Sequence, residues 1–215
     1  MSRVIKDIDA GLEAYPDLQR VTEDGFIRVK GEIPLIHPEK GEIDRYEVLI
    51  KFPESFPRCF PNVIETSKKI PRIADRHVNN DNTLCLAVLP EERVISKNGI
   101  SFKFFLDKLL VPHLARETYR ERKGVYPDGE YAHGYEGIWE YYEGTLGQDD
   151  RTKIIEELEI IVHSKWPERN HKCPCGSGLK FKKCHNEKWN EIIKPGRDYV
   201  QKTLILLKGN LHETN

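Results

Sequence analysis

The sequence has no run of about 18 apolar residues, so no segment is expected to span a membrane. Its first residues, Met1 to Asp7, lack the apolar core of a secretory signal peptide. The chain also contains no internal repeat and no low-complexity tract. Of its 215 residues, 38% are hydrophobic and 32% are charged, which is typical of a soluble globular protein. We therefore expect a cytoplasmic protein that makes no contact with a membrane.

Cysteine is scarce, and its distribution is uneven. Three of the five cysteines lie within residues 173–184, and the odd total does not fit a complete set of disulfides. Count and spacing together indicate reduced thiols, as found in the cytosol. Once the clustered three are assigned to a metal, only Cys59 and Cys85 remain for other roles. Cys59 lies between two Phe-Pro pairs, where we expect it to pack in a core turn.

The net charge of −1 hides an asymmetry between the two ends of the chain. The segment from Lys165 onward carries 11 Lys/Arg and 5 Asp/Glu, whereas the preceding part carries 23 Lys/Arg and 30 Asp/Glu. An acidic body followed by a basic segment suggests two modules. The basic residues leave three readings open: contact with nucleic acid, contact with an acidic protein, or a solvated surface.

The most specific pattern is Cys-Pro-Cys-Gly-Ser-Gly-Leu-Lys-Phe-Lys-Lys-Cys-His, at residues 173–185. It offers three thiols and one imidazole as metal donors: Cys173, Cys175, Cys184 and His185. Structural Zn2+ sites use this donor set in tetrahedral geometry. Because the protein fills all four positions, none is left for a water nucleophile, and we expect a structural zinc ion. Gly176 and Gly178 allow the backbone to curl around the donors.

Hydrophobic periodicity predicts an α+β protein, with a helix first, an antiparallel meander next and helices last. The expected helices cover residues 4–20, 101–122, 134–146, 150–164 and 197–208, and the expected strand segments cover 26–30, 46–52 and 62–66. Residues 66–98 are expected to be irregular. Pro112 is expected to kink or split the helix that contains it.

The segment rich in cysteine resembles the SEC-C zinc motif almost residue for residue, over about residues 170–190. Small modules of that family end many bacterial proteins and usually mediate protein contacts. The resemblance therefore implies a structural Zn2+ ion and a docking role for this end of the chain. It does not name the activity of the remainder.

A second resemblance covers about residues 5–125. It rests on Tyr46-Glu-Val-Leu-Ile-Lys-Phe-Pro-Glu-Ser-Phe-Pro, on Cys59-Phe-Pro-Asn-Val, on His77 and on Leu84-Cys85-Leu86, and a later aromatic segment, 126–142, is also similar. Together these resemble bacterial members of the ubiquitin-conjugating enzyme family. The resemblance implies an N-terminal helix, a four-stranded antiparallel meander and C-terminal helices, followed here by a small zinc-binding module.

The expected domain organisation follows from both resemblances. Residues 1–147 form the ubiquitin-conjugating-enzyme-like domain, and 148–166 form a connecting amphipathic helix. Residues 167–190 form the zinc-binding motif, and 191–215 form a C-terminal helix or tail.

The second resemblance also implies a chemistry for Cys85. This thiol would accept a ubiquitin-like modifier from an activating enzyme as a thioester and pass it to an amine of a protein target. Bacterial proteins of this kind resemble components of gene clusters tied to antiviral defence. A cysteine between two leucines also fits a small buried hydrophobe, so the residue alone does not decide its role.

The surroundings of Cys85 depart from the family pattern of His-Pro-Asn. His77 occupies the offset where the family has asparagine, and Ala87 stands where an acidic residue is often found. The oxyanion contact is therefore left open among Asn79, Asn80 and His77, or none of them. His133 is a further candidate donor or base. His77 and His133 also suit purely structural roles.

Two alternative functions remain beside the conjugating enzyme. The imperfect histidine–asparagine spacing favours a catalytically inactive binding module of the same fold. The basic segment suggests a nucleic-acid-associated or ribosome-associated zinc protein, although nucleic acid is the less expected partner.

Overall fold

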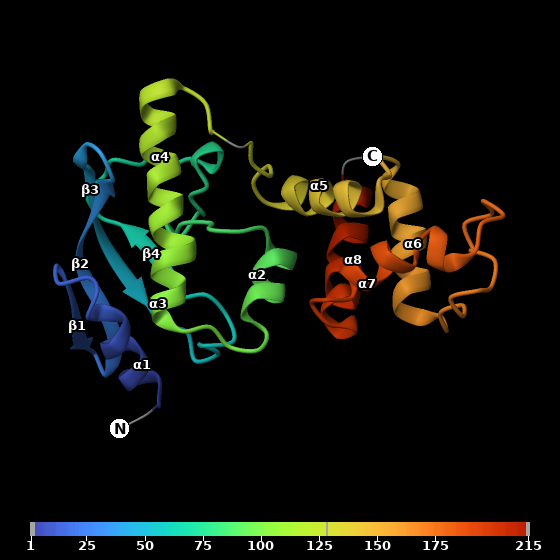
Figure 1. Cartoon of the computed structure of the whole chain (residues 1–215), viewed down its shortest axis with the longest axis horizontal. Coiled ribbons are helices and arrows are strands. Elements are labelled where there is room, and N and C mark those ends of the chain that lie inside the picture. The colour runs from blue at the N-terminus through green and yellow to red at the C-terminus, as the bar shows by residue number, and fades with distance from the viewer. Residues whose placement is uncertain (1–2, 128, 214–215) are drawn as a thin grey trace. The chain divides into compact units, whose positions relative to one another are not determined.

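The computed structural model describes residues 3–127 and 129–213, which divide into two compact units (Figure 1). The first unit comprises the chain up to Ala87 together with Ile95–His133. The second comprises Val88–Val94 and the chain from Gly134 onward. Among the described residues, no helix is both long enough and apolar enough to cross a membrane.

The first unit is built on a four-stranded antiparallel sheet in the order β1-β2-β3-β4. The strands are β1 (Leu18–Glu23), β2 (Phe26–His37), β3 (Gly41–Lys51) and β4 (Asn62–Glu65). Side chains of alternate β3 residues are buried, at Tyr46, Val48 and Ile50, because successive residues of a strand face opposite sides of the sheet. The expected mixed α+β class with an antiparallel meander is confirmed.

The N-terminal helix is shorter than the sequence indicated. Helix α1 spans Arg3–Leu12, and the amide of Tyr15 then bonds to the carbonyl of Leu12 at 2.9 Å in a turn. The expectation of a helix over residues 4–20 was wrong. Leu18, assigned to the helical stripe, instead begins β1 with only 4% of its surface exposed. Its apolar side chain fits either periodicity, and pairing with β2 decides the outcome.

The long helical segment of the first unit is continuous, as Figure 1 shows. It consists of α3 (Phe102–Phe105), a π-helical turn over Leu106–Leu110, and α4 (Val111–Lys123). Pro112 was expected to kink or split it; the helical hydrogen-bond pattern changes to a π turn over Leu106–Leu110, and α4 begins with Val111 and Pro112. Phe105, Leu110 and Leu114 are fully buried in the core cluster that also contains the sheet residues.

The region 66–98 is less irregular than expected. It contains a 3-10 turn at Ala74–Arg76 and helix α2 (Leu89–Ser96). The expectation of an irregular stretch was therefore wrong at α2. This helix has only eight residues, and Glu91 and Glu92 in its first turn complement the helix dipole.

The second unit is helical. Besides most of α2, its elements are α5 (Tyr135–Leu146), α6 (Arg151–His163), the 3-10 turn η3 (Phe181–Lys183), α7 (Asn186–Ile192) and α8 (Arg197–Glu213). The Asp150 carboxylate caps α6 by accepting hydrogen bonds from the amides of Thr152 and Lys153. The sequence predicted α5, α6 and α8, whereas α7 was not expected.

Candidate metal centre and candidate thiol site

The donor atoms of the cysteine-rich segment converge. One ligand atom from each predicted residue lies within 4.8 Å of the other three: Cys173, Cys175, Cys184 and His185. Nδ1 of His185 is 3.2 Å from Sγ of Cys173 and 3.1 Å from Sγ of Cys184. Sγ of Cys175 is 3.5 Å from Sγ of Cys184. Donors of a tetrahedral zinc ion are separated by roughly 3.5–3.8 Å, so a slight expansion of this cluster would admit the ion.

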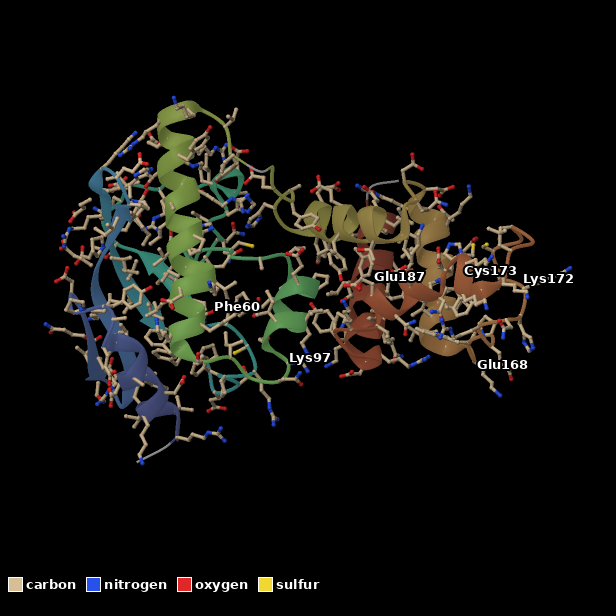
Figure 2. The ribbon with its side chains drawn as sticks, in the orientation of Figure 1. Phe60, Lys97, Glu168, Lys172, Cys173 and Glu187 are labelled. Atoms are coloured by element: carbon tan, nitrogen blue, oxygen red, sulfur yellow. The ribbon has the colours of Figure 1, made fainter. Side chains whose placement is uncertain are left out.

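The local backbone explains why these donors meet. The amide of Cys173 bonds to the carbonyl of Leu179 at 2.8 Å, and the loop between them turns back through Gly176 and Gly178, both at positive φ. This is the left-handed conformation that glycine adopts without strain. The turn η3 then brings Cys184 and His185 to the same place. Figure 2 shows Cys173 beside the other sulfur atoms.

The thiols of this cluster differ in acidity. Burial raises the pKa of Cys173 to about 11. Burial would also raise the pKa of Cys175, but hydrogen bonds from Ser177 and from the neighbouring thiols lower it to about 6. A thiolate is the form that ligates a metal, so Cys175 is ready to bind, whereas the Cys173 proton must be displaced. With all four positions held by the protein, the site suits a structural metal.

A cluster of aromatic side chains packs against the metal loop. Phe181, the first residue of η3, is 1% exposed and packs edge-on against Trp189 of α7, with ring centroids 5.0 Å apart. Trp166, which follows α6, lies 5.4 Å from Trp189 in the same manner. These aromatic rings connect the metal loop to helices α6 and α7. The metal loop is therefore part of the packed second unit.

Cys85 lies at the end of a short two-stranded bridge in the first unit. Val78 pairs with Leu84, and the amide of Cys85 donates to the carbonyl of His77 at 2.7 Å. The amide of Leu84 bonds to the carbonyl of Val63, which attaches the bridge to β4. The side chain of Cys85 is half-buried, and its Sγ lies 3.6 Å from the carbonyl oxygen of Ala87.

Three of the residues predicted to assist Cys85 lie together. Nε2 of His133 is 3.2 Å from Oδ1 of Asn79, and the rings of His133 and His77 are 6.3 Å apart. Asn80, in contrast, is exposed at the tip of the loop, and none of the interactions resolved among the described residues joins it to this group. Burial lowers the pKa of His133, and the charge of His77 lowers it further, so its imidazole stays neutral to lower pH.

Two neighbours of this group were not predicted from the sequence. A carboxylate oxygen of Glu130 lies within hydrogen-bond distance of Nε2 of His77. His113, on α4, lies 6.5 Å from the His77 ring, and its own Nε2 has no hydrogen-bond partner among the described residues. Glu130 lies 53 residues after His77, and no sequence pattern marks the pair. The position of His113 just after Pro112 in an apolar helix could have drawn attention to it.

Two comparisons with known proteins each match a short part of the chain. Residues 169–187 match the SEC-C motif. A segment of 44 residues is 43% identical to the protein translocase subunit SecA of Sulfurovum sp. (strain NBC37-1), and it covers 20% of this chain. The chain spans about 4% of the length of that relative. Residues 169–187 therefore form a SEC-C motif, a zinc-binding type, whose three thiols and one imidazole could hold one metal ion.

Proposed function

We propose that the first unit is a ubiquitin-conjugating-enzyme-like domain that carries a ubiquitin-like modifier as a thioester on Cys85. The observation that carries this proposal is the position of Cys85. It follows a helix and a four-stranded meander, precedes the long helix, and is bonded through His77 to the loop whose Asn79 contacts the imidazole of His133. The helix, meander and cysteine follow one another in the same order in the family that the sequence resembles.

The first proposed step is acyl exchange between two sulfurs. The Cys85 thiolate attacks the carbonyl of the modifier thioester held by an activating enzyme, and the thiolate of that enzyme leaves. One thioester replaces another, so the step is close to isoenergetic and needs little acid–base assistance. A half-buried thiol beside a polar loop is accessible enough for this exchange.

The second proposed step is aminolysis by an amine of a protein target. The amine nitrogen attacks the thioester carbonyl, the Cys85 thiolate leaves, and the amine loses a proton. The Asn79 side chain is oriented for a supporting role, because Oδ1 accepts from His133 and Nδ2 donates one hydrogen to Oγ1 of Thr83 at 3.0 Å. The second hydrogen of Nδ2 would stabilise the oxyanion.

His133 is the proposed base for the incoming amine. With Nε2 donating to Asn79, its Nδ1 is the nitrogen that accepts a proton. Its lowered pKa keeps this nitrogen unprotonated near neutral pH. His133 would therefore compensate for Ala87, which supplies no carboxylate near the thiol.

Adduct formation tests the assignment of Cys85. The full chain, an activating enzyme and a ubiquitin-like protein from the same gene neighbourhood are mixed with ATP, and the products are separated with and without reductant. We expect a reductant-sensitive adduct for the native chain and for the matched control Cys59→Ala. Cys85→Ser should yield a reductant-resistant oxyester, and Cys85→Ala should yield nothing. An equal adduct on Cys85→Ala would exclude Cys85 as the carrier.

A catalytically inactive module of the same fold is the second candidate, favoured by Ala87 and by the altered asparagine spacing. Alkylation rates distinguish the two. In the carrier, Cys85 reacts with iodoacetamide faster than Cys59, which packs against the core. In an inactive module with a protected Cys85, the order is reversed.

For the SEC-C motif we propose a docking role toward a protein partner. Its surface carries exposed basic residues: Lys172, Lys180, Lys182 and Lys183. Lys172 lies at the outer edge of the loop in Figure 2, next to the inward-facing Cys173. Leu179, 51% exposed, adds an apolar contact at the same loop. Binding to nucleic acid with a steep salt dependence would favour the alternative reading of this surface.

A further inference from the structure

The metal ligand His185 has a second nitrogen that faces helix α6. Its Nε2 lies 3.4 Å from Oε1 of Glu157, while Nδ1 faces the thiols of Cys173 and Cys184. Both partners are mostly shielded, with side-chain exposures of 16% for His185 and 17% for Glu157. The imidazole therefore lies between the donor cluster and a carboxylate, with a different nitrogen directed at each.

The same carboxylate oxygen accepts a hydrogen bond from Trp189. Nε1 of Trp189 donates to Oε1 of Glu157 at 2.5 Å. His185 precedes α7 and Trp189 lies one turn later, where its amide bonds to the His185 carbonyl at 2.8 Å. Residues four apart on a helix share a face. Glu157 thus joins α6 to the first turn of α7 through both side chains.

A carboxylate in this place determines which nitrogen of the imidazole carries the hydrogen. An indole N–H can only donate, so Oε1 of Glu157 is the acceptor toward Trp189, and the same oxygen lies beside Nε2 of His185. An acceptor beside Nε2 favours the tautomer with hydrogen on Nε2 and a lone pair on Nδ1. The lone pair is then directed at the position that a metal would occupy among the thiolates. Ligating histidines generally have such an outer partner, which orients the ring and raises its basicity.

We infer that Glu157 is a positioning residue of the metal centre. It holds His185 in the Nε2–H tautomer with Nδ1 toward the three thiolates, and it attaches the metal loop to α6. Glu157 lies 28 residues before His185 and outside residues 169–187. The matched motif therefore does not contain the carboxylate that contacts its histidine. Metal affinity and the packing of α6 against α7 are thereby linked through one side chain.

The test compares Glu157→Gln with Glu156→Gln in the full chain. Glu156 is the adjacent residue on α6, is exposed, and offers the same change of charge. Zinc affinity is measured by competition with a chromogenic chelator. We expect Glu157→Gln to weaken zinc binding by about 10-fold to 100-fold, and Glu156→Gln to leave it unchanged. Equal affinities of both variants would overturn the inference.

Thermal unfolding distinguishes a residue that positions the metal ligand from one that only stabilises the fold. Each variant is melted with and without zinc, and the rise in Tm caused by zinc is compared. A positioning role reduces this rise in Glu157→Gln. A structural brace would lower both melting temperatures equally and leave the rise unchanged, which would also contradict the inference.

The native chain provides a readout that needs no variant. Nitrogen-15 NMR of the zinc-loaded protein reports which nitrogen of His185 binds the metal. We expect a metal-bound Nδ1 and a protonated Nε2. A metal-bound Nε2 would overturn the inference even if Glu157→Gln failed to fold, and none of these readouts depends on Cys85.

Discussion

His113 is the clearest case at the residue scale of a group whose state is imposed by its surroundings. Burial lowers its pKa to about 3, and the nearby charges of His77 and Arg116 act in the same direction. Its Nε2 is inaccessible to solvent and has no hydrogen-bond partner among the described residues. The imidazole is therefore neutral in the native protein over a pH range in which an unfolded histidine takes up a proton.

This difference predicts a loss of stability in acid. Between the ordinary pKa of about 6.5 and the native pKa of about 3, the unfolded chain binds a proton at His113 and the native protein does not. Stability is thus complete above pH 6.5 and falls as pH decreases. His113→Gln should remove up to about 3 kcal/mol of the loss between pH 7 and 4.5, measured by urea unfolding.

His37→Gln, at the end of β2 in the same unit, is the control for that measurement. It should leave the pH dependence close to that of the native chain. If His113→Gln shows the same decline as the control, His113 is protonated in the native state and its proposed neutrality is wrong.

Individual residues also differ in whether their place in a site could be predicted from the sequence. The four donors of the metal loop lie within 13 residues, so their spacing was sufficient to predict them. His77, Asn79 and His133 came from a family resemblance, and the structure brings them together. Glu157 carried a weak signal, since it lies beside the apolar stripe of α6, but only the fold places it next to His185.

At the scale of elements, an ion pair links α4 to the 3-10 turn that precedes the Cys85 loop. Nη2 of Arg76 lies 2.7 Å from Oε2 of Glu117, whose side chain is fully buried, and Tyr126 donates to the other carboxylate oxygen. Arg76 also contacts Glu121 at 3.0 Å, but Glu121 is 65% exposed. One arginine therefore has a buried and an exposed partner on the same helix.

The two partners should differ strongly in their effect on stability. Glu117→Ala leaves the mostly buried guanidinium of Arg76 without its main partner and should lower the free energy of unfolding by about 3–5 kcal/mol. Glu121→Ala, the matched control, removes an exposed pair and should cost less than about 1 kcal/mol. Chemical denaturation monitored by circular dichroism measures both. Similar losses from the two substitutions would contradict this assignment.

The elements also show where local sequence reasoning fails. The first three residues of β1 were assigned to the preceding helix because Leu18 fits both periodicities, and only pairing with β2 distinguishes them. Helix α7 was missed because seven residues carry little periodic signal, and its burial depends on Trp166 and Phe181 from elsewhere in the chain. Longer amphipathic helices such as α6 and α8 were predicted because their apolar stripes repeat over several turns.

At the scale of the whole molecule, metal binding should affect the two units differently. Structural zinc sites contribute directly to the free energy of folding. All three tryptophans of the chain lie in the second unit: Trp139, Trp166 and Trp189. Tryptophan fluorescence therefore reports on that unit alone, which allows its unfolding to be followed separately from the sheet.

Removal of zinc by a chelator should lower the midpoint of the fluorescence-detected transition by about 10 °C or more. The transition of the sheet unit, followed by circular dichroism of its strands, should stay in place, because the metal ligands all belong to the second unit. Restoring zinc should restore the midpoint. If the midpoint of the fluorescence-detected transition is unchanged by the chelator, the four donors do not hold a structural metal.

The division of the chain between the units has a practical consequence for dissecting the protein. Because Val88–Val94 belong to the second unit while the residues on both sides belong to the first, the backbone passes between the units three times. A single cut after His133 would leave this segment on the wrong fragment. If the two fragments were produced separately and mixed, the seven residues Val88–Val94 on one fragment would have to pack with the rest of the second unit on the other. We therefore expect the fragments to reassemble poorly. Cys85 lies two residues before Ala87, the last residue before the first crossing, so the carrier thiol proposed above is close in sequence to the point where the chain leaves the first unit.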